Sequence, residues 1–129
     1  DMKNIYIIGG NGAVSEKYAN ELSAYGEVIR VFGQSRYDTS VEVAKTFCRN
    51  ADNAVVANGK NFPDGLCGGL LAAVLDAPLV LTADSKTNAA KEYMKETSIS
   101  SGYVLGGEGA LTDNTVVTVF GVDSTEDII

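Results

Sequence analysis

Ala54-Val-Val-Ala-Asn-Gly-Lys-Asn-Phe-Pro-Asp64 is the stretch of sequence that decides the fold class. A short, continuous apolar run ends in a polar loop, and an apolar segment at residues 65–75 follows Pro63 and Asp64. Such a run is typical of a strand that is buried on both faces of a parallel sheet. The segment after the loop is apolar on every side, which favours a helix in the centre of a domain. The stretch therefore predicts one strand–loop–helix unit of an α/β domain.

The same alternation continues along the chain. Apolar runs predict strands at residues 5–8, 28–32, 54–57, 79–81 and 103–105, and a β-branched run predicts a sixth, edge strand at residues 116–120. Helices are expected between them, at residues 16–24, after a capping-box pattern in Thr39-Ser-Val-Glu42, at residues 65–75 and near residues 90–96. Alternating strands and helices imply right-handed crossovers and a three-layer, doubly wound, mostly parallel α/β fold.

Two blocks of the sequence occur twice in the same order. Tyr6-Ile-Ile-Gly-Gly-Asn-Gly-Ala-Val-Ser15 matches Tyr103-Val-Leu-Gly-Gly-Glu-Gly-Ala-Leu-Thr112, with five of ten residues identical. Val28-Ile-Arg-Val-Phe-Gly33 matches Val116-Val-Thr-Val-Phe-Gly121, but the two blocks lie nine residues closer together in the second copy. This spacing predicts that the second copy has lost the helix of the first and keeps a turn at residues 112–115. Matching ends of this kind are typical of a tandem array.

The repeat also divides the chain. Residues 1–33 are predicted to be the tail of a preceding repeat, residues 34–122 one repeat, and residues 123–129 a polar tail. Because terminal repeats are atypical, the shortened second copy predicts that the array ends here. Six glycines in the repeated blocks are predicted to form tight turns after strands. One proline is also assigned a structural role. These residues are Gly9, Gly10, Gly12, Gly106, Gly107, Gly109 and Pro78.

Composition narrows the function. The net charge is −7 and the pI about 4.4, without the basic cluster that nucleic acids or anionic membranes require. Histidine, the usual general base and commonest metal ligand, is absent. No apolar run is long enough to span a membrane. Catalysis, a resident cofactor and a dedicated metal site are therefore not expected. Cys48 and Cys67 are expected to be buried free thiols, with a disulfide as the alternative.

Two groups of polar and aromatic residues follow predicted strands, where open α/β sheets bind ligands. Arginine, lysine, asparagine and aromatic side chains suit an acidic or phosphorylated polysaccharide, through charge-assisted hydrogen bonds and ring stacking. The alternative is that these residues only order their loops, with Arg36 paired to Asp38 or Asp64. The candidate contacts are Arg36, Tyr37, Asn58, Lys60, Asn61, Phe62 and Asp64.

A nucleotide or sugar phosphate is a second hypothesis, because Gly10-Asn-Gly-Ala-Val-Ser15 follows a strand and opens a helix. However, serine replaces the last glycine of the dinucleotide-binding pattern, and the second strand lacks the expected acid after it. At Gly107 the following helix is predicted to be missing, so no helix dipole could hold a phosphate there. Asp38 and Asp64, the carboxylates that could suggest catalysis, are explained as helix N-caps. A third hypothesis is a module that only assembles with its siblings.

Four stretches, taken in order, resemble the cell wall binding repeat type 2 family of Gram-positive surface proteins. They are Arg30-Val-Phe-Gly33 with Ser35-Arg-Tyr-Asp-Thr39, Val55-Val-Ala-Asn-Gly59 with Asn61-Phe-Pro-Asp-Gly-Leu66, Ala77-Pro-Leu-Val-Leu-Thr82, and Tyr103-Val-Leu-Gly-Gly107. The resemblance implies a Toprim-like fold and tandem repeats around a pseudo-threefold axis. It also implies that the family's motif positions in this sequence are Arg36, Tyr37, Asn58, Phe62, Asp64 and residues 78–81.

The resemblance also implies a function. It implies that a secreted protein is held noncovalently at the cell wall by an anionic polymer, teichoic-acid-like or a phosphorylated polysaccharide, beside a separate effector region such as an amidase, protease or adhesin. An acidic module and an anionic polymer repel each other overall. Binding is then expected to depend on basic loops, on hydrogen bonding or on bridging Ca²⁺ or Mg²⁺. Sibling repeats are the other expected partners, and a lone copy is expected to self-associate through the face they would cover.

Overall fold

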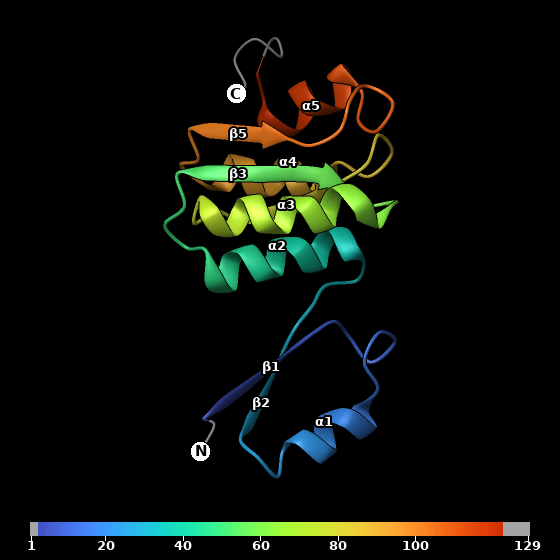
Figure 1. Ribbon diagram of the computed structural model, residues 1–129, viewed down its shortest axis with the longest axis vertical. Coiled ribbons are helices and arrows are strands. Elements are labelled where there is room, and N and C mark those ends of the chain that lie inside the picture. Colours follow the sequence, from blue (N-terminus) through green and yellow to red (C-terminus); the bar gives the residue numbers. More distant parts are fainter. Residues whose placement is uncertain (1–2, 123–129) are drawn as a thin grey trace.

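The computed structural model describes residues 3–122, which form a smaller and a larger part joined at a narrow waist (Figure 1). The smaller part contains β1 (Asn4–Ile8), α1 (Glu16–Leu22) and β2 (Glu27–Val31), with β1 and β2 paired in parallel. The larger part contains the remaining elements, in a parallel sheet of order β4-β3-β5. They are α2 (Arg36–Phe47), β3 (Asn53–Asn58), α3 (Phe62–Val74), β4 (Leu79–Thr82), α4 (Asn88–Glu96), β5 (Ser101–Val104) and α5 (Asp113–Phe120).

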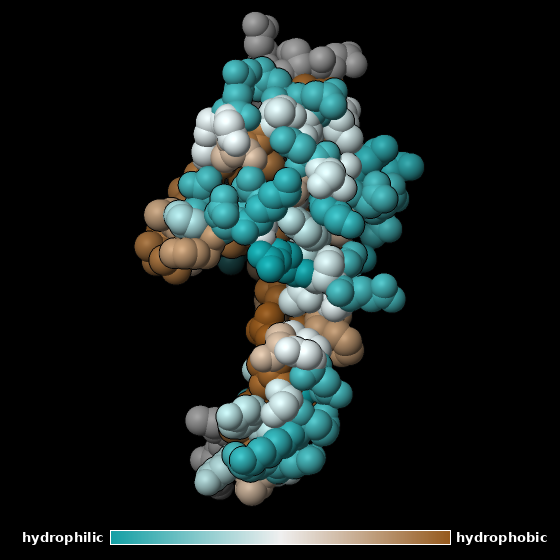
Figure 2. Space-filling model, turned by 90° about the vertical axis from the view of Figure 1, so that its right-hand side faces the viewer, coloured by the Kyte–Doolittle hydropathy of each residue, from teal (hydrophilic) through white to brown (hydrophobic). Residues whose placement is uncertain are grey.

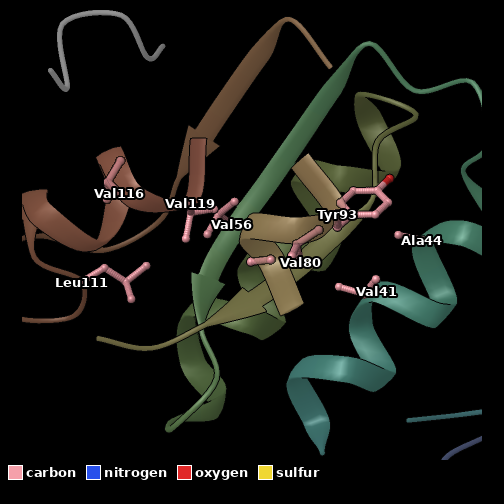
Figure 3. Close-up of a cluster of buried hydrophobic side chains, with 9 residues drawn as sticks. Val41, Ala44, Val56, Val80, Tyr93, Leu111, Val116 and Val119 are labelled. Carbon is pink, nitrogen blue, oxygen red and sulfur yellow. The ribbon is translucent and has the colours of Figure 1, made fainter. Parts of the chain in front are cut away.

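Helices cover both faces of the three-stranded sheet. On one face, Val56 of β3 and Val80 of β4 pack against side chains from α2, α4 and α5 (Figure 3). On the other face lies α3, where a Cβ added to Gly68 would come within 2.9 Å of both Leu79 and Leu105. A helical glycine costs about 1 kcal/mol relative to alanine, and the close approach of helix to sheet offsets that cost. The predicted three-layer α/β architecture is confirmed, although the strands form two parallel sheets rather than one.

Most predicted elements lie where the apolar pattern places them. The five apolar runs form β1 to β5, with bounds shifted by one or two residues. The predicted inner face of α4 is also confirmed, because Ala90 and Tyr93 are buried while Lys91 is exposed. Continuous apolar strands thus give a reliable signal when both faces of a sheet are covered.

The predicted N-caps of α2 and α3 are wrong by several residues. α2 begins after Ser35, whose Oγ accepts a hydrogen bond from Asp38 N at 3.2 Å. Thr39 lies inside the helix, where its Oγ1 accepts from Gly33 N at 3.0 Å, so the predicted capping box does not form. α3 begins after Asn61. Asp38 and Asp64 therefore lie in first turns rather than at caps, where a carboxylate still interacts favourably with the helix dipole.

The predicted edge strand at residues 116–120 is wrong, because these residues belong to α5. Thr112, expected in a turn, is the N-cap, and its side chain accepts from Thr115 N at 3.3 Å. Gly121 ends the helix in the left-handed conformation, with φ at 67°. Between the caps, Thr115, Val116 and Val119 are buried, and their three- and four-residue spacings form one helical face.

The internal repeat is consequently more regular than the sequence suggested. With a constant separation of 97 positions, α5 is the counterpart of α1. Ala13 N donates to Gly10 O at 3.0 Å and Ala110 N donates to Gly107 O at 2.9 Å, so both loops fold alike. The second copy therefore keeps its helix, and the match between residues 28–33 and 116–121 is a coincidence of composition. The argument that a lost helix marks the end of an array fails with it. The counterpart of β2 falls at residues 124–128, outside the described residues.

α3 is not central, contrary to the prediction. Its sheet-facing side is buried, but Phe62, Leu66, Leu70 and Val74 are 80%, 69%, 72% and 84% exposed. These four residues, here called the α3 stripe, follow one another at four-residue spacing along one face. Hydrophobic residues protrude from the larger part in Figure 2.

Both cysteines are free thiols, as expected. However, Cys67 is exposed and Cys48 only half-buried, so the predicted burial is wrong for Cys67 and incomplete for Cys48. Burial, and to a smaller degree the charge of Asp76, raises the pKa of the Cys48 thiol.

Candidate functional site

The polar groups predicted to follow the second and third strands meet in the structure. Arg36, at the start of α2, donates from Nη1 to the carbonyl oxygen of Gly59 at 2.7 Å. Tyr37 lies over the same backbone, because a Cβ added to Gly59 would be 2.6 Å from its ring. β2 and β3 belong to different sheets, so the contact depends instead on α2, which packs on β4 and begins near the end of β3. It joins residues 23 positions apart in sequence.

A hollow of about 430 Å³ lies beside this contact. Arg36 is exposed and forms no ion pair within residues 3–122, so the alternative in which it pairs with Asp38 or Asp64 is wrong. Its hydrogen bond to Gly59 uses one N–H and leaves the other guanidinium donors for a ligand. Phe62 contributes an exposed ring. The lining residues are Arg36, Gly59, Asn61, Phe62, Gly65, Leu66, Leu79 and Leu81.

Two of the predicted contacts serve the fold instead. Asn58 is 9% exposed, its Nδ2 donates to Ala110 O at 2.6 Å, and its Oδ1 accepts from Lys60 N at 2.8 Å. Asp64 lies against Gly106, where an added Cβ would be 2.8 Å from its Oδ2. Gly106 also has φ at 95°, so glycine is required there for two reasons. Arg36, Lys60, Asn61 and Phe62 remain as the exposed candidates, with Tyr37 half-buried behind them.

Asp84, which the sequence analysis did not single out, joins the loop after β4 to the start of α5. Its Oδ1 accepts from Thr112 N and Thr112 Oγ1, each at 3.1 Å, and from Thr115 Oγ1. The hydrogen bond from Thr115, followed by that from the Thr112 backbone, lowers the pKa of the Asp84 carboxyl. An aspartate in the loop after the strand predicted at residues 79–81 was a signal, but its partners lie 28 and 31 positions away.

Arg30 holds the glycine-rich loop after β1. Nη1 donates to Gly9 O at 2.8 Å and Nη2 donates to Val14 O at 2.7 Å. The helix that follows this loop has Glu16 in its first turn, and α5 likewise has Asp113. The expectation that no helix follows Gly107 is wrong, but carboxylates at both helix starts disfavour a phosphate there. The structure thus adds no support for the nucleotide hypothesis.

Residues 3–122 contain neither a cluster of metal ligands nor a membrane-spanning helix. No three aspartate, glutamate or cysteine side chains gather there as metal ligands would. No helix in this range has the length and apolar character that crossing a bilayer demands.

An exposed guanidinium and an exposed ring lie beside this hollow, as expected of a binding module built on a small α/β fold. The chain belongs to the Cell wall binding domain 2 (CWB2) family, whose pattern it matches over residues 30–116. The family resemblance predicted from the four sequence stretches is confirmed. The family places the chain in secreted proteins of the bacterial cell wall and surface.

Two curated proteins of Bacillus subtilis (strain 168) are similar. The chain is 36% identical to the N-acetylmuramoyl-L-alanine amidase LytC over 116 residues, which is 88% of the chain and 23% of that protein. It is 39% identical to the amidase enhancer over 83 residues, 64% of the chain and 12% of that protein. The chain therefore spans less than a quarter of either relative.

Two solved structures from Clostridium difficile match almost the whole chain. Cwp8 has a TM-score of 0.81 and 28% identity, covering 98% of this chain and 21% of Cwp8. Cwp6 has the same TM-score and coverage at 22% identity, which shows the fold alone. The Toprim likeness and the pseudo-threefold axis stay predictions.

Proposed function

We propose that this module holds a secreted protein at the cell wall by binding an anionic wall polymer noncovalently in the hollow beside Arg36. One observation supports the proposal above the others. The Arg36 guanidinium is fixed by its hydrogen bond to Gly59, yet it is exposed and unpaired within residues 3–122. A positioned guanidinium with free donors suits the phosphate or carboxylate of a polymer, since its planar fork can bind two oxygens at once.

Neighbouring groups fit a sugar-containing ligand. The exposed ring of Phe62 offers a flat apolar face for a sugar ring, and Asn61 offers an amide. Lys60 adds a second exposed positive charge on the same loop. Lys86 lies on a connected loop, because Gly59 N donates to Thr82 O and Thr82 Oγ1 donates to Lys86 O. Local basic groups can thus attract an anion although the whole chain carries −7.

Retention of the protein on purified cell walls tests the proposal. Walls are compared before and after chemical removal of their anionic polymers, and the proposal expects retention to fall sharply on the stripped walls. Equal retention on both would reject the polymer as the ligand. A module that only assembles with sibling repeats would be retained on neither.

Substitution of Arg36 by glutamine tests the site itself. Arg36→Gln removes charge-assisted hydrogen bonds worth about 1.5 kcal/mol or more, so affinity should fall about tenfold. Lys91→Gln removes one positive charge from the exposed surface of α4 and should leave affinity nearly unchanged. Equal losses in the two variants would mean that net charge, and not this hollow, determines binding.

A bridging divalent cation is the alternative to direct contact with the basic groups. If Ca²⁺ or Mg²⁺ joins carboxylates of the module to the polymer, a chelator should release the protein from the wall. Direct binding by Arg36 and Lys60 predicts instead that added salt releases it while a chelator does not. The two treatments separate the mechanisms on the same wall preparation.

We also infer that the module acts beside sibling repeats and a separate effector region of a longer protein, such as an amidase or protease. Its 23% share of LytC and 21% share of Cwp8 support this inference. Under this proposal the module supplies attachment and the effector region supplies chemistry.

A further inference from the structure

Asparagine is followed by glycine at two places in the chain, Asn11-Gly12 and Asn58-Gly59. Asparagine is a chemically labile residue, and it reacts fastest before glycine. Glycine has no side chain to hinder the approach of its own backbone nitrogen, and it has the widest choice of backbone angles. In a folded protein the reaction also requires that the asparagine amide and the glycine N–H are free to move. The two pairs differ in both respects.

The Asn11–Gly12 pair is free. It lies in the loop between β1 and α1, which projects from the smaller part (Figure 1). Asn11 and Gly12 are exposed, and within residues 3–122 neither the Asn11 amide group nor the Gly12 N–H forms a hydrogen bond. A Cβ added to Gly12 would meet nothing within 4 Å. The backbone between the two residues therefore has room to rotate.

The Asn58–Gly59 pair is held in place. Asn58 is 9% exposed, its Nδ2 donates to Ala110 O, and its Oδ1 accepts from Lys60 N. Gly59 N donates to Thr82 O at 2.9 Å. Both reacting groups are thus engaged, and reaction at this pair would first require local opening of the end of β3.

The second copy of the loop shows that its tip stays exposed beside a larger sheet. The counterparts of the first pair, 97 positions later, are Glu108 and Gly109. The strand before them, β5, is paired with β3, and the Asn58 amide binds the same loop. Even so, Glu108 and Gly109 are exposed, and a Cβ added to Gly109 would meet nothing within 4 Å. Exposure at this loop position therefore does not depend on a free edge of the preceding strand.

We propose that Asn11–Gly12 is a site of spontaneous deamidation. The backbone nitrogen of Gly12 attacks Asn11 Cγ and closes a cyclic imide. The Cγ–Nδ2 bond breaks, and Nδ2 leaves as ammonia with the proton from Gly12 N. Water then opens the ring, at Cγ to give aspartate or at the backbone carbonyl carbon of Asn11 to give isoaspartate. Nothing is oxidised or reduced, and water is the only co-reactant. The inference goes beyond wall binding, because it does not depend on the polymer.

The two products differ in how well the loop accommodates them. Both add a negative charge at position 11. Aspartate resembles Glu108, the acid that the second copy carries at the same loop position. Isoaspartate adds a methylene group to the backbone, inside a turn that hydrogen bonds from Ala13 N and Val14 N to Gly10 O close. Aspartate therefore leaves the turn intact, whereas isoaspartate disrupts it.

Incubation of the full chain in heavy-oxygen water tests the proposal, because each opened ring keeps an oxygen atom from the solvent. Peptide mass spectrometry follows the label at both pairs over time. In the folded chain we expect Asn11 to be labelled faster than Asn58 by roughly tenfold or more. In the chain unfolded by guanidinium the two rates should converge, because both pairs then have the same local freedom. Absence of label at Asn11, equal rates in the folded chain, or a difference that persisted after unfolding would overturn the proposal.

Glycine-to-alanine substitutions at matched positions give the control. Gly12→Ala should fold, because the φ of Gly12 is outside the left-handed region and a Cβ has open space. Its methyl group hinders attack by the backbone nitrogen, so labelling at Asn11 should slow severalfold. Gly109→Ala changes the counterpart glycine, which has the same open space, and should leave the rate at Asn11 unchanged. If the two variants were labelled equally fast at Asn11, the label would not come through Gly12 N, and the proposal would be wrong.

Discussion

At the scale of single residues, two arginines show how one side chain supports either the fold or a ligand. The Arg30 side chain is only 15% exposed, and both of its terminal nitrogens donate to backbone carbonyls. Its contact with the exposed Glu16, at 3.6 Å, adds little beside these hydrogen bonds. Arg36 makes one such bond and remains exposed. Burial and the number of backbone partners therefore distinguish a structural arginine from one that can bind a polymer.

Replacing Arg30 should destabilise the smaller part. Arg30→Met removes two charge-assisted hydrogen bonds to half-buried carbonyls, which should lower the free energy of unfolding by about 2–3 kcal/mol. Urea denaturation followed by tyrosine fluorescence measures the loss. Arg49→Met, at an exposed position, serves as the control and should change stability by less than about 0.5 kcal/mol. Similar losses in both variants would contradict a structural role for Arg30.

Asp84 should make the docking of α5 sensitive to acid. Its pKa is lowered in the folded chain, chiefly by the hydrogen bond from Thr115. The carboxylate therefore stabilises the fold above its unfolded pKa of about 3.9, and this contribution is lost as the pH falls through the lower folded value. The thermal unfolding midpoint should decrease in that acid range. Asp84→Asn should have a lower midpoint at neutral pH and a weaker decrease in acid.

The control for this prediction is an exposed carboxylate elsewhere. Glu92→Gln on α4 should follow the unmodified chain at every pH. If Asp84→Asn lost as much stability in acid as the unmodified chain, another carboxyl would be responsible.

At the scale of secondary-structure elements, α5 shows where local sequence signals compete. Its β-branched residues favour a strand, but the propensity difference is only a fraction of a kcal/mol per residue. Capping at Thr112 and Gly121, together with burial of Val116 and Val119, outweighs it. The sequence pattern alone could not decide between helix and strand. Val116 and Val119 have the spacing of one helical face, but they also match Val28 and Val31 of the strand β2. Strands β1 to β5 were predictable because their apolar runs are short and continuous.

The two helix N-caps offer a matched test of capping. The Thr112 side chain accepts from Thr115 N, whereas Ser15, its counterpart before α1, makes no such hydrogen bond. Thr112→Ala should therefore cost about 1 kcal/mol of stability. Ser15→Ala should cost at most a few tenths of a kcal/mol. Thermal or chemical unfolding of the two variants measures the difference, and an equal cost would contradict the assigned role of the Thr112 side chain.

The candidate site was predictable in place but not in detail. Arg36 and Gly59 follow two predicted strands and do meet, although β2 and β3 lie in different sheets and not in the single sheet that was expected. The structural duties of Asn58 and Asp64 depend on Ala110 and Gly106, which a single sequence does not place beside them. From the sequence alone, Asn58 and Asp64 therefore could not be distinguished from the exposed candidate residues. Contacts between distant loops, and not residue type, separate binding groups from supporting groups here.

At the scale of the whole molecule, two of the exposed apolar surfaces within residues 3–122 bear on how the module associates. One is a cleft at the waist, between Ile8 of the smaller part and Leu79 of the larger part, and the other is the α3 stripe on the larger part. Four large apolar side chains in line on one helix form a patch that proteins usually cover with a partner. The chain resembles repeats in longer proteins, where neighbouring repeats are available as partners. A lone copy lacks them.

The isolated chain should therefore self-associate through the α3 stripe. Burying a leucine side chain stabilises a contact by about 2 kcal/mol, so losing one at the centre of the stripe should weaken association more than tenfold. Leu70→Lys makes this change at the middle of α3, away from the hollow beside Arg36. Tyr25→Lys is the control, because Tyr25 is equally exposed, at 71%, but lies in the smaller part. Small-angle scattering over a concentration series should show growing particle mass for the unmodified chain and for Tyr25→Lys, and a monomer for Leu70→Lys. A monomer at every concentration for all three proteins would contradict self-association, and equal association of all three would move it to another surface.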